Sequence, residues 1–230
     1  MLFNMDKERI VIEIGSGWTK VLVGSSLGTK KKKGLVNENI KVRDTFLIKT
    51  PMNFGSYSDS DMDMEKQFMP FFNVVELAER IKEKLQERKI KAEKVIITIS
   101  DRSVLSREMV LPKVEEEKLK EVIGYELQEL LSIDPKRYLI DFKVIEEVKV
   151  DEALKYKLIV GALPKEEGQF YHEFIHNLGR EPFALDVTSN TIAKLFDCNM
   201  KINGQLREIE DKTFAYVDIG YANILSLIHI

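Results

Sequence analysis

Runs of β-branched and other apolar residues, separated by polar segments, predict strands at the start of the chain. Arg9–Ile14 and Thr19–Gly24 are two such runs, and the short segment 15–18 between them carries two glycines. Two strand patterns joined by a short glycine-containing loop are typical of a β-hairpin. A third run, Ile40–Lys49, predicts another strand. The opening of the chain therefore predicts strands rather than helices.

An amphipathic helix is predicted over residues 74–89. Its apolar residues recur with the 3.6-residue period of a helix, and glutamates and lysines lie opposite. These apolar residues are Val74, Leu77, Ala78, Ile81 and Leu85. We expect the helix to lie on a sheet, because its apolar face needs a second layer. Further on, the pattern predicts a helix from Lys165 to a C-cap at Gly179, a strand over Phe183–Val187 and a short helix over Ser189–Phe196.

The middle of the chain predicts a compact ββαββ subdomain inserted at residues 93–163. Its first two strands are expected to pair with each other, and acidic residues open its helix, where they complement the helix dipole. The predicted elements are the strands Lys94–Ser100 and Val104–Leu111, a helix from Glu115 to Leu131, and the strands Tyr138–Lys149 and Leu154–Leu163, which turn around Asp151–Ala153.

The end of the chain repeats the pattern of its beginning. Thr213–Gly220 and Ile224–Ile230 predict a second hairpin, in which Asp218 precedes Gly220 by two positions, as Glu13 precedes Gly15. The two carboxylates are 205 residues apart, from Glu13 to Asp218. A single long spacing suggests a duplicated domain, because solenoid repeats recur at roughly 20 to 50 residues. We therefore expect a second, related domain to begin at residue 213.

Composition places the chain among ordinary globular proteins and narrows its partners. Of 230 residues, 44% are hydrophobic and 32% charged, and the net charge is −3, so no overall positive field favours nucleic acid. The single cysteine, Cys198, excludes an intrachain disulfide. No apolar run approaches the roughly 18 residues of a membrane span, and the N-terminus lacks a signal-peptide core. A cytoplasmic protein without a direct span is therefore expected.

The two hairpins have the chemistry of a phosphate clamp. Turn N–H groups and the Lys20 ammonium can bind phosphate oxygens, while Glu13 and Asp218 can hold Mg²⁺ directly or through water. Glycine lets the backbone approach such a ligand closely. The glycines in question are Gly15, Gly17 and Gly220. The alternative interpretation is that each Glu/Asp-Ile-Gly sequence is simply a hairpin turn.

A literal H-E-x-x-H sequence at His172–His176 is the competing signal. On a helix it places two imidazoles on one face for zinc, with Glu173 beside them. The third ligand position of the extended motif is Pro182, which cannot bind zinc. Core packing already explains the helix, through Phe170, Phe174 and Leu178. We therefore reject His172 and His176 as a metal site, and keep a zinc hydrolase only as a remote alternative.

Several of these motifs together resemble the actin-like ATPase superfamily and, within it, the PilM family of type IV pilus assembly proteins, which are related to the division protein FtsA. Glu13–Lys20 resembles the first phosphate motif of the superfamily, and Val217–Gly220 resembles the second. The remaining similarities are to the PilM pattern and include its inserted subdomain. They lie at Arg107–Pro112, Leu119–Leu131, Asp141–Val144, Gly161–Lys165 and Leu178–Asp186.

This resemblance implies an α/β fold with an actin-like, ribonuclease H-like first lobe. The lobe would comprise residues 1–92 and 164–212, with the inserted subdomain at 93–163 and the start of a truncated second lobe at 213–230. The resemblance also implies ATP and Mg²⁺ as cofactors of the complete protein. The implied nucleotide-binding residues are Glu13, Gly15, Ser16, Gly17, Trp18, Thr19, Lys20, Asp218, Gly220 and Asn223. Glu13 replaces the usual aspartate, Trp18 a small residue, and Asn223 a common serine or threonine.

The function implied by the resemblance is assembly, with no turnover by this chain and at most weak ATPase activity in a complete protein. A PilM-like scaffold recruits the N-terminal tail of PilN, a bitopic membrane protein, to a groove between the first subdomain and the insertion. It thereby lies at the inner face of the cytoplasmic membrane with other pilus inner-membrane components. An FtsA-like division protein and an active actin-like ATPase remain the alternatives.

Overall fold

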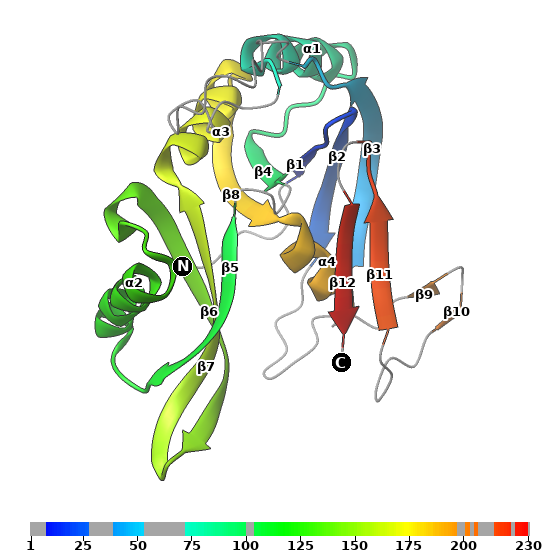
Figure 1. Cartoon of the computed structure of the whole chain (residues 1–230). Helices are drawn as coiled ribbons and strands as arrows, with labels where there is room; N and C mark the ends of the chain where they lie inside the picture. The colour runs from blue at the N-terminus through cyan, green and yellow to red at the C-terminus, as the bar shows by residue number, and fades with distance from the viewer. Residues whose placement is uncertain are drawn as a thin grey trace. The chain divides into compact units, whose positions relative to one another are not determined.

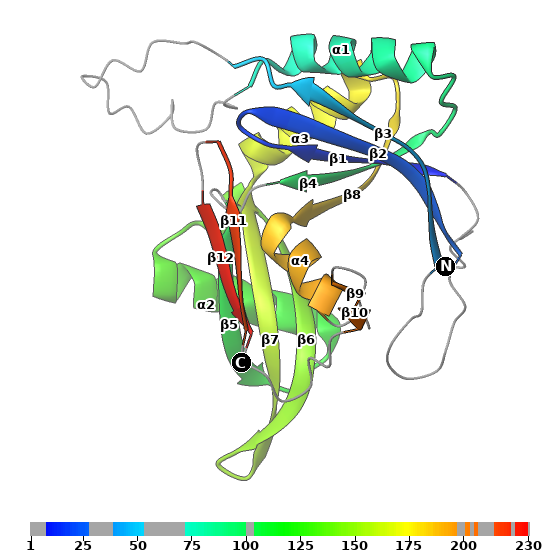
Figure 2. The same cartoon turned by 90° about the vertical axis from the view of Figure 1, so that its right-hand side faces the viewer.

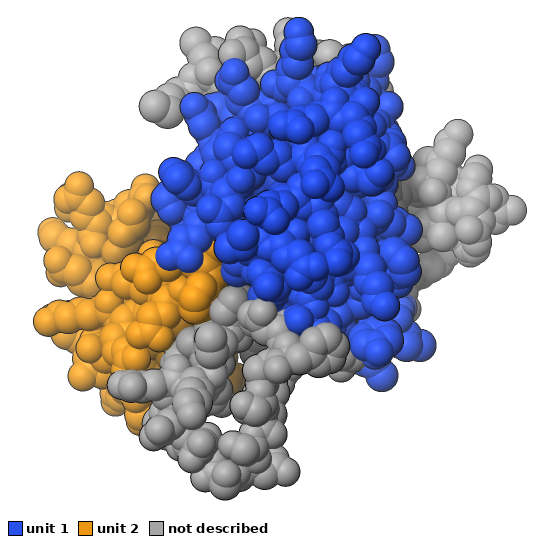
Figure 3. Space-filling model, turned by 90° about the horizontal axis from the view of Figure 1, so that it is seen from above, with its two compact units in different colours: residues 1–100, 171–230 blue, residues 101–170 orange. Residues whose placement is uncertain are grey.

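The computed structural model divides the chain into two units, coloured separately in Figure 3. The first unit comprises residues 1–100 and 171–230, and the second comprises residues 101–170. The described residues are 8–27, 39–52, 72–99, 104–196, 201–202, 205–206, 214–221 and 224–229.

A five-stranded sheet with the order β3-β2-β1-β4-β8 is the centre of the first unit (Figure 1). Its first three strands are an antiparallel meander, and the last two run parallel to β1. The strands are β1 (Arg9–Ile14), β2 (Trp18–Leu27), β3 (Asn39–Lys49), β4 (Lys94–Ile99) and β8 (Glu181–Val187). The hairpin predicted from the opening pattern is confirmed as β1 and β2, with Glu13 directly opposite Lys20.

Helices cover both faces of this sheet, as Figure 2 shows. The helices α1 (Val74–Glu87) and α3 (Lys165–Asn177) lie on one face, and α4 (Thr188–Phe196) lies on the other. Alternation along β1 follows from this: Ile10, Ile12 and Ile14 are buried, whereas the residues between them are only partly buried. The side chain of Asn73 caps α1 by accepting a hydrogen bond from the N–H of Glu76 at 3.1 Å.

An aromatic group lies in the core of the first unit. The ring of Phe72 meets that of Phe174 edge to face, with centroids 6.1 Å apart, and that of Tyr171 at 6.4 Å. Phe72 and Phe174 are both completely buried. Edge-to-face pairs at this separation add attraction to the burial of the rings, so this group stabilises the first unit.

The second unit has its own sheet and its own core. Its sheet has the order β5-β7-β6, and α2 packs on one face. The elements are β5 (Leu105–Pro112), α2 (Glu116–Leu131), the 3-10 turn η2 (Pro135–Arg137), β6 (Tyr138–Val150) and β7 (Ala153–Pro164). The buried residues that form this second core all belong to the second unit. They are Met109, Leu111, Leu119, Ile123, Leu127, Leu158, Val160 and Ala162.

The predicted ββαββ insertion is corrected to βαββ. The strand Lys94–Ile99 does not pair with β5; it lies between β1 and β8 in the sheet of the first unit. Val95, Ile97 and Ile99 are buried there and the intervening Ile96 is partly buried, as in a central parallel strand with layers on both faces. The separate unit accordingly begins after β4, at residue 101 instead of 93, and extends to residue 170 instead of 163.

The second predicted hairpin is confirmed as β11 (Phe214–Ile219) and β12 (Ile224–His229), an antiparallel two-stranded sheet. A shorter pair, β9 (Lys201–Ile202) and β10 (Gln205–Leu206), precedes it. Among the residues described, no helix is both long enough and apolar enough to cross a membrane.

Candidate functional site

The turn between β1 and β2 requires glycine at two positions, because other parts of the protein approach it closely. A Cβ atom on Gly15 would lie 2.7 Å from the carbonyl oxygen of Trp18, and one on Gly17 would lie 2.9 Å from the Cβ of Tyr221. Both distances are shorter than real Cβ contacts. The absence of a side chain at these glycines therefore leaves room for other atoms of the protein. The contact between Gly17 and Tyr221 brings the turns of the two hairpins together.

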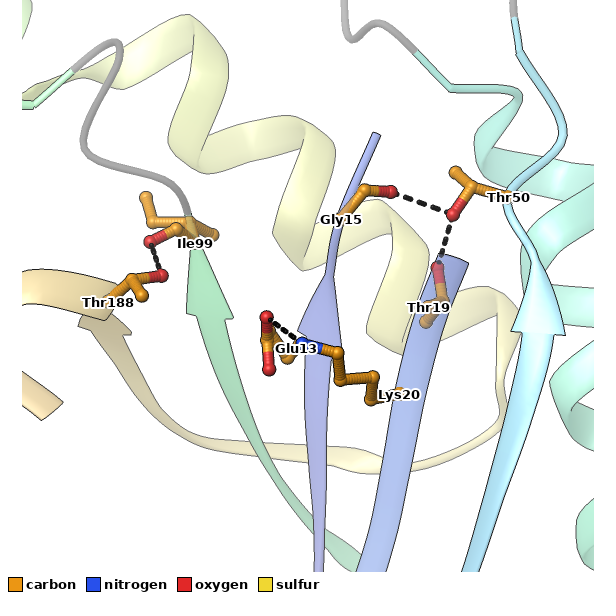
Figure 4. Close-up of polar contacts among 7 residues, drawn as sticks. All are labelled: Glu13, Gly15, Thr19, Lys20, Thr50, Ile99 and Thr188. Atoms are coloured by element: carbon orange, nitrogen blue, oxygen red, sulfur yellow. Dashed lines mark hydrogen bonds and ion pairs between the residues drawn. The ribbon is translucent and has the colours of Figure 1, made fainter. Parts of the chain in front are cut away.

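A buried pair of threonines fixes this turn to the end of β3 (Figure 4). The Thr50 hydroxyl donates to the carbonyl oxygen of Gly15 at 2.7 Å, and the Thr19 and Thr50 hydroxyls lie 2.9 Å apart. Thr50 has used its only hydrogen, so Thr19 is the donor between them. The N–H of Thr50 donates to the carbonyl oxygen of Gly17 at 3.1 Å. Thr50 thus holds both ends of the turn segment 15–17.

The side chains of Glu13 and Lys20 form an ion pair below this turn, with Nζ 2.8 Å from Oε1 (Figure 4). The side chain of Lys20 is 56% exposed and that of Glu13 is 35% exposed. Both therefore remain accessible to a ligand from solvent, although each at present neutralises the other.

The second hairpin contributes charge to the same place. The pKa of Lys20 is raised, first by its hydrogen bond to Glu13 and also by the charges of Glu13, Asp218 and Tyr216, against partial burial. Burial raises the pKa of Tyr216, and the carboxylates of Asp218 and Glu13 raise it further. Lys20 is therefore protonated at neutral pH. The stability that its ion pair contributes is present below pH 10.5 and is lost as the pH rises through the raised pKa.

A polar row crosses the sheet on the face that α4 covers. Register places Lys20, Glu13, Thr98 and Asp186 side by side on β2, β1, β4 and β8. Asp186 accepts hydrogen bonds from Asn190 Nδ2 at 2.7 Å and Lys194 Nζ at 2.5 Å. The row lies at the carboxyl ends of the parallel strands, which is where open α/β sheets usually bind ligands.

The hydroxyl of Thr188 anchors α4 to this edge, since it donates to the carbonyl oxygen of Ile99 at 2.8 Å (Figure 4). This contact joins the first residue of α4 to the last residue of β4. It therefore fixes the start of α4 beside the polar row.

The structure brings together Glu13, Lys20 and Asp218, the three charged residues predicted from sequence. The Thr19 side chain is completely buried against Thr50, so its hydroxyl is used within the protein. Trp18 and Gly220 are exposed, Ser16 is partly buried, and Asn223 lies outside the described residues. Sequence reasoning missed Thr50, Thr98, Asp186 and Tyr216; the register of the strands and the contact between the hairpins identify them.

The donor set fits the Mg²⁺ and phosphate that an actin-like fold implies. Glu13 and Asp218 carry carboxylate oxygens, which Mg²⁺ prefers, and Lys20 carries the ammonium that a phosphate oxygen needs. Glu13 and Asp218 both act electrostatically on Lys20, so one cation and one anion could be held in the same place. These side chains therefore carry the charges and the oxygen donors that a magnesium–phosphate group needs.

The H-E-x-x-H helix has no further metal ligands within the described part of the chain. His172 and His176 are exposed on α3, and the described residues contain no cluster of three or more His, Cys, Asp or Glu side chains suited to a metal. Buried Tyr171, Phe174 and Ile175 lie on the other face of the helix. Core packing therefore explains the apolar residues of this helix, as expected from sequence.

We expect protein purified without chelators to carry no stoichiometric zinc, because a tetrahedral zinc site needs at least three protein ligands. Elemental analysis by mass spectrometry checks this, with His229→Ala as the control for a histidine outside the motif. One zinc ion per chain that is lost in His172→Ala but kept in His229→Ala would contradict the prediction.

Comparisons with known proteins found matches among solved structures only; no family model and no curated protein matches the chain. A chain of the PilM–PilN type IV pilus biogenesis complex matches with a TM-score of 0.69 and 19% identity, over 96% of this chain and 57% of that one. The cytoplasmic domain of EpsL, an inner-membrane component of the type II secretion system of Vibrio cholerae, matches with a TM-score of 0.46 and 11% identity, over 78% of this chain and 57% of that one.

A Bacteroides thetaiotaomicron protein with an actin-like ATPase fold and unknown function matches with a TM-score of 0.35 and 12% identity, over 85% of this chain and 58% of that one. A TM-score below 0.5 does not establish a shared fold, so these last two matches support no conclusion about this chain.

The class of fold follows from the sheet topology and the first of these matches. An antiparallel meander followed by two parallel strands, with helices on both faces, is the ribonuclease H-like arrangement of an actin-like first lobe, and the predicted α/β class is confirmed. Within this class the chain is similar to a chain of the PilM–PilN complex. At 19% identity this similarity establishes the fold, and the chain spans 57% of the length of the chain that it matches.

Proposed function

We propose that this chain is a PilM-like adaptor that binds the cytoplasmic N-terminal segment of a PilN-like membrane protein. The observation that carries the proposal is the similarity to a chain of the PilM–PilN complex over 96% of this chain, which includes both units. The partner would hold the adaptor at the inner face of the cytoplasmic membrane, beside other components of the pilus machine. The alternatives are an FtsA-like division protein and an active actin-like ATPase, which would have the same fold.

Free strand edges make an extended peptide a suitable partner. Among the strands that the structure describes, the edges of the first sheet are β3 and β8 and those of the second are β5 and β6, each paired on one side only. An extended peptide can add to such an edge, where backbone hydrogen bonds provide affinity and alternate side chains provide specificity. The groove predicted between the two units stays a prediction.

The test is fluorescence anisotropy of a labelled peptide from the N-terminus of a PilN-like protein. We expect micromolar binding to the intact chain and none to a variant whose residues 105–162 are replaced by a short Gly-Ser linker. The linker can be short, because Leu105 and Ala162 lie directly opposite each other on β5 and β7. The variant keeps β4, which the first sheet requires.

Two controls make this result decisive. Circular dichroism and the fluorescence of Trp18, the only tryptophan, confirm that the first unit stays folded in the linker variant. A scrambled peptide of the same composition measures non-specific binding. Equal binding to both proteins, or no binding to either, would contradict the adaptor proposal.

We propose a second function at the polar site, the binding of Mg²⁺ and nucleotide phosphates. It is favoured by the convergence of Glu13, Asp218 and Lys20. When bound, Mg²⁺ would neutralise phosphate charge, while Lys20 would orient a phosphate oxygen and the turn at 15–17 would limit its approach. We propose no turnover by this chain.

We expect calorimetry with Mg-ATP to show binding weaker than micromolar, because the exposed site leaves its charges screened by water. Lys20→Ala is expected to weaken binding by at least tenfold, since it removes the phosphate-binding cation. Lys41→Ala is the control, because Lys41 is an exposed lysine on β3 outside the polar row. Tight binding that is unaffected by Lys20→Ala would show that the nucleotide site lies elsewhere.

A further inference from the structure

Glu13 and Lys20 currently satisfy each other, although each is suited to a different ligand. They are direct cross-strand neighbours on β1 and β2, and their charged groups meet at 2.8 Å. A carboxylate in this position can bind a divalent cation, and an ammonium can bind a phosphate. A cation on the Glu13 carboxylate weakens its attraction for Lys20, and a phosphate on the Lys20 ammonium weakens its attraction for Glu13, so each ligand competes with this contact.

The neighbours of the pair within the sheet carry no charge. In the same row of the sheet, Thr98 lies beside Glu13 and Leu47 beside Lys20, and neither carries a charge. From the second hairpin, Asp218 and Tyr216 act on Lys20 through charge, whereas Glu13 also accepts its hydrogen bond. The Glu13–Lys20 contact is thus the specific interaction with which a ligand competes.

We propose that the Glu13–Lys20 ion pair is an autoinhibitory contact that makes polyphosphate binding at this site depend on a divalent cation. The cation takes the Glu13 carboxylate, and the released Lys20 ammonium takes a phosphate oxygen. This inference deepens the proposed nucleotide site and rests on it for the identity of the natural ligand. The probes in its test carry no nucleoside.

Reciprocal coupling follows from the shared contact. A cation that has separated the pair removes that cost for the anion, and an anion that has separated it removes the same cost for the cation. Such coupling must be equal in both directions. Because the pair is partly exposed, its strength is that of a surface salt bridge, which corresponds to roughly a threefold to fivefold effect on affinity.

Glu13→Gln separates this mechanism from a purely structural role, because its effect should change sign with the metal. The variant removes the charge that holds Lys20 and also removes a ligand for the cation. In metal-free buffer with a chelator, we expect tripolyphosphate to bind Glu13→Gln about threefold to fivefold more tightly than the original chain. With Mg²⁺ present, we expect the same variant to bind tripolyphosphate more weakly than the original chain.

Calorimetry measures these affinities, and two control variants isolate the contact. Glu147→Gln makes the same charge change at another exposed glutamate–lysine pair, that of Glu147 with Lys113 at 2.7 Å, and is expected to have no effect. Asp218→Asn removes a charge that acts on Lys20 without removing the hydrogen bond that Lys20 donates to Glu13. It is expected to give a smaller metal-free gain than Glu13→Gln.

The proposal is overturned if Glu13→Gln fails to gain affinity in metal-free buffer, if Glu147→Gln or Asp218→Asn gains as much, or if no variant binds tripolyphosphate. Failure of the nucleotide proposal looks different. In that case Mg-ATP binds no better than tripolyphosphate with Mg²⁺, while the change of sign in Glu13→Gln persists.

Discussion

Replacing Phe174 with alanine is expected to lower the free energy of unfolding of the first unit by about 3 to 5 kcal/mol, the usual cost of removing a buried phenyl ring. The ring is completely buried and meets Phe72 edge to face at 6.1 Å. Its removal leaves a cavity and breaks the aromatic group above the sheet. Urea unfolding followed by the fluorescence of Trp18 measures the loss, because this tryptophan lies in the same unit.

Val75→Ala is the matched control for Phe174→Ala. Val75 lies on α1, which packs on the same face of the sheet, but its side chain is 55% exposed. We expect a change within about 0.5 kcal/mol, as for most surface substitutions. Similar losses in both variants would mean that the aromatic group is not a structural centre of the unit.

Thr50→Val is expected to destabilise the first unit by about 2 kcal/mol, because it removes a buried hydroxyl without changing the size of the side chain. The Gly15 carbonyl loses its donor and the completely buried Thr19 hydroxyl loses its acceptor. Since Thr50 holds the turn at 15–17, tripolyphosphate with Mg²⁺ should also bind more weakly. Urea unfolding and calorimetry measure the two effects.

Thr45→Val provides the comparison for Thr50→Val. Thr45 lies on β3, and its side chain is exposed. We expect its stability and its affinity for tripolyphosphate to stay close to those of the original chain. An equal effect at the two positions would indicate that the Thr19–Thr50 pair does not hold the turn.

The local pattern of apolar and polar residues was sufficient to predict the individual helices and strands named here. The apolar runs flanking Gly15–Trp18 predicted β1 and β2, and the 3.6-residue period over 74–89 predicted α1. These elements carry their own signals, because alternation and periodicity depend only on which face of the element is buried.

Pairing between distant strands was harder to predict, as β4 illustrates. The run Lys94–Ser100 was predicted to be a strand, and Lys94–Ile99 is one, but proximity in sequence suggested the wrong partner. Its almost uninterrupted β-branched composition is the signal that was missed, since such runs are typical of parallel strands buried on both faces. Its partners, β1 and β8, lie far along the chain in both directions.

The residues of the candidate site that belong to a sequence motif were predictable. Those that only the folded geometry brings to the site were not. Repetition of a carboxylate two positions before glycine identified Glu13 and Asp218. Asp186 joins them only because β8 pairs with β4 in a particular register, and Thr50 contributes through contacts 35 and 31 residues away along the chain. Neither the strand register nor the Thr50 contacts can be recognised from a short stretch of sequence.

The two ends of the inserted unit lie beside each other, and this lowers the entropic cost of closing the main sheet. β8 must find β4 across 87 residues, from Lys94 to Glu181. Once β5 and β7 have paired, Leu105 and Ala162 are neighbours, and the 57 residues from one to the other no longer lengthen the loop. Shortening the effective loop from about 87 to about 30 residues lowers the closure cost by about 1 kcal/mol. An insertion that folds before the sheet closes therefore lowers the entropic cost of assembling the sheet that it interrupts.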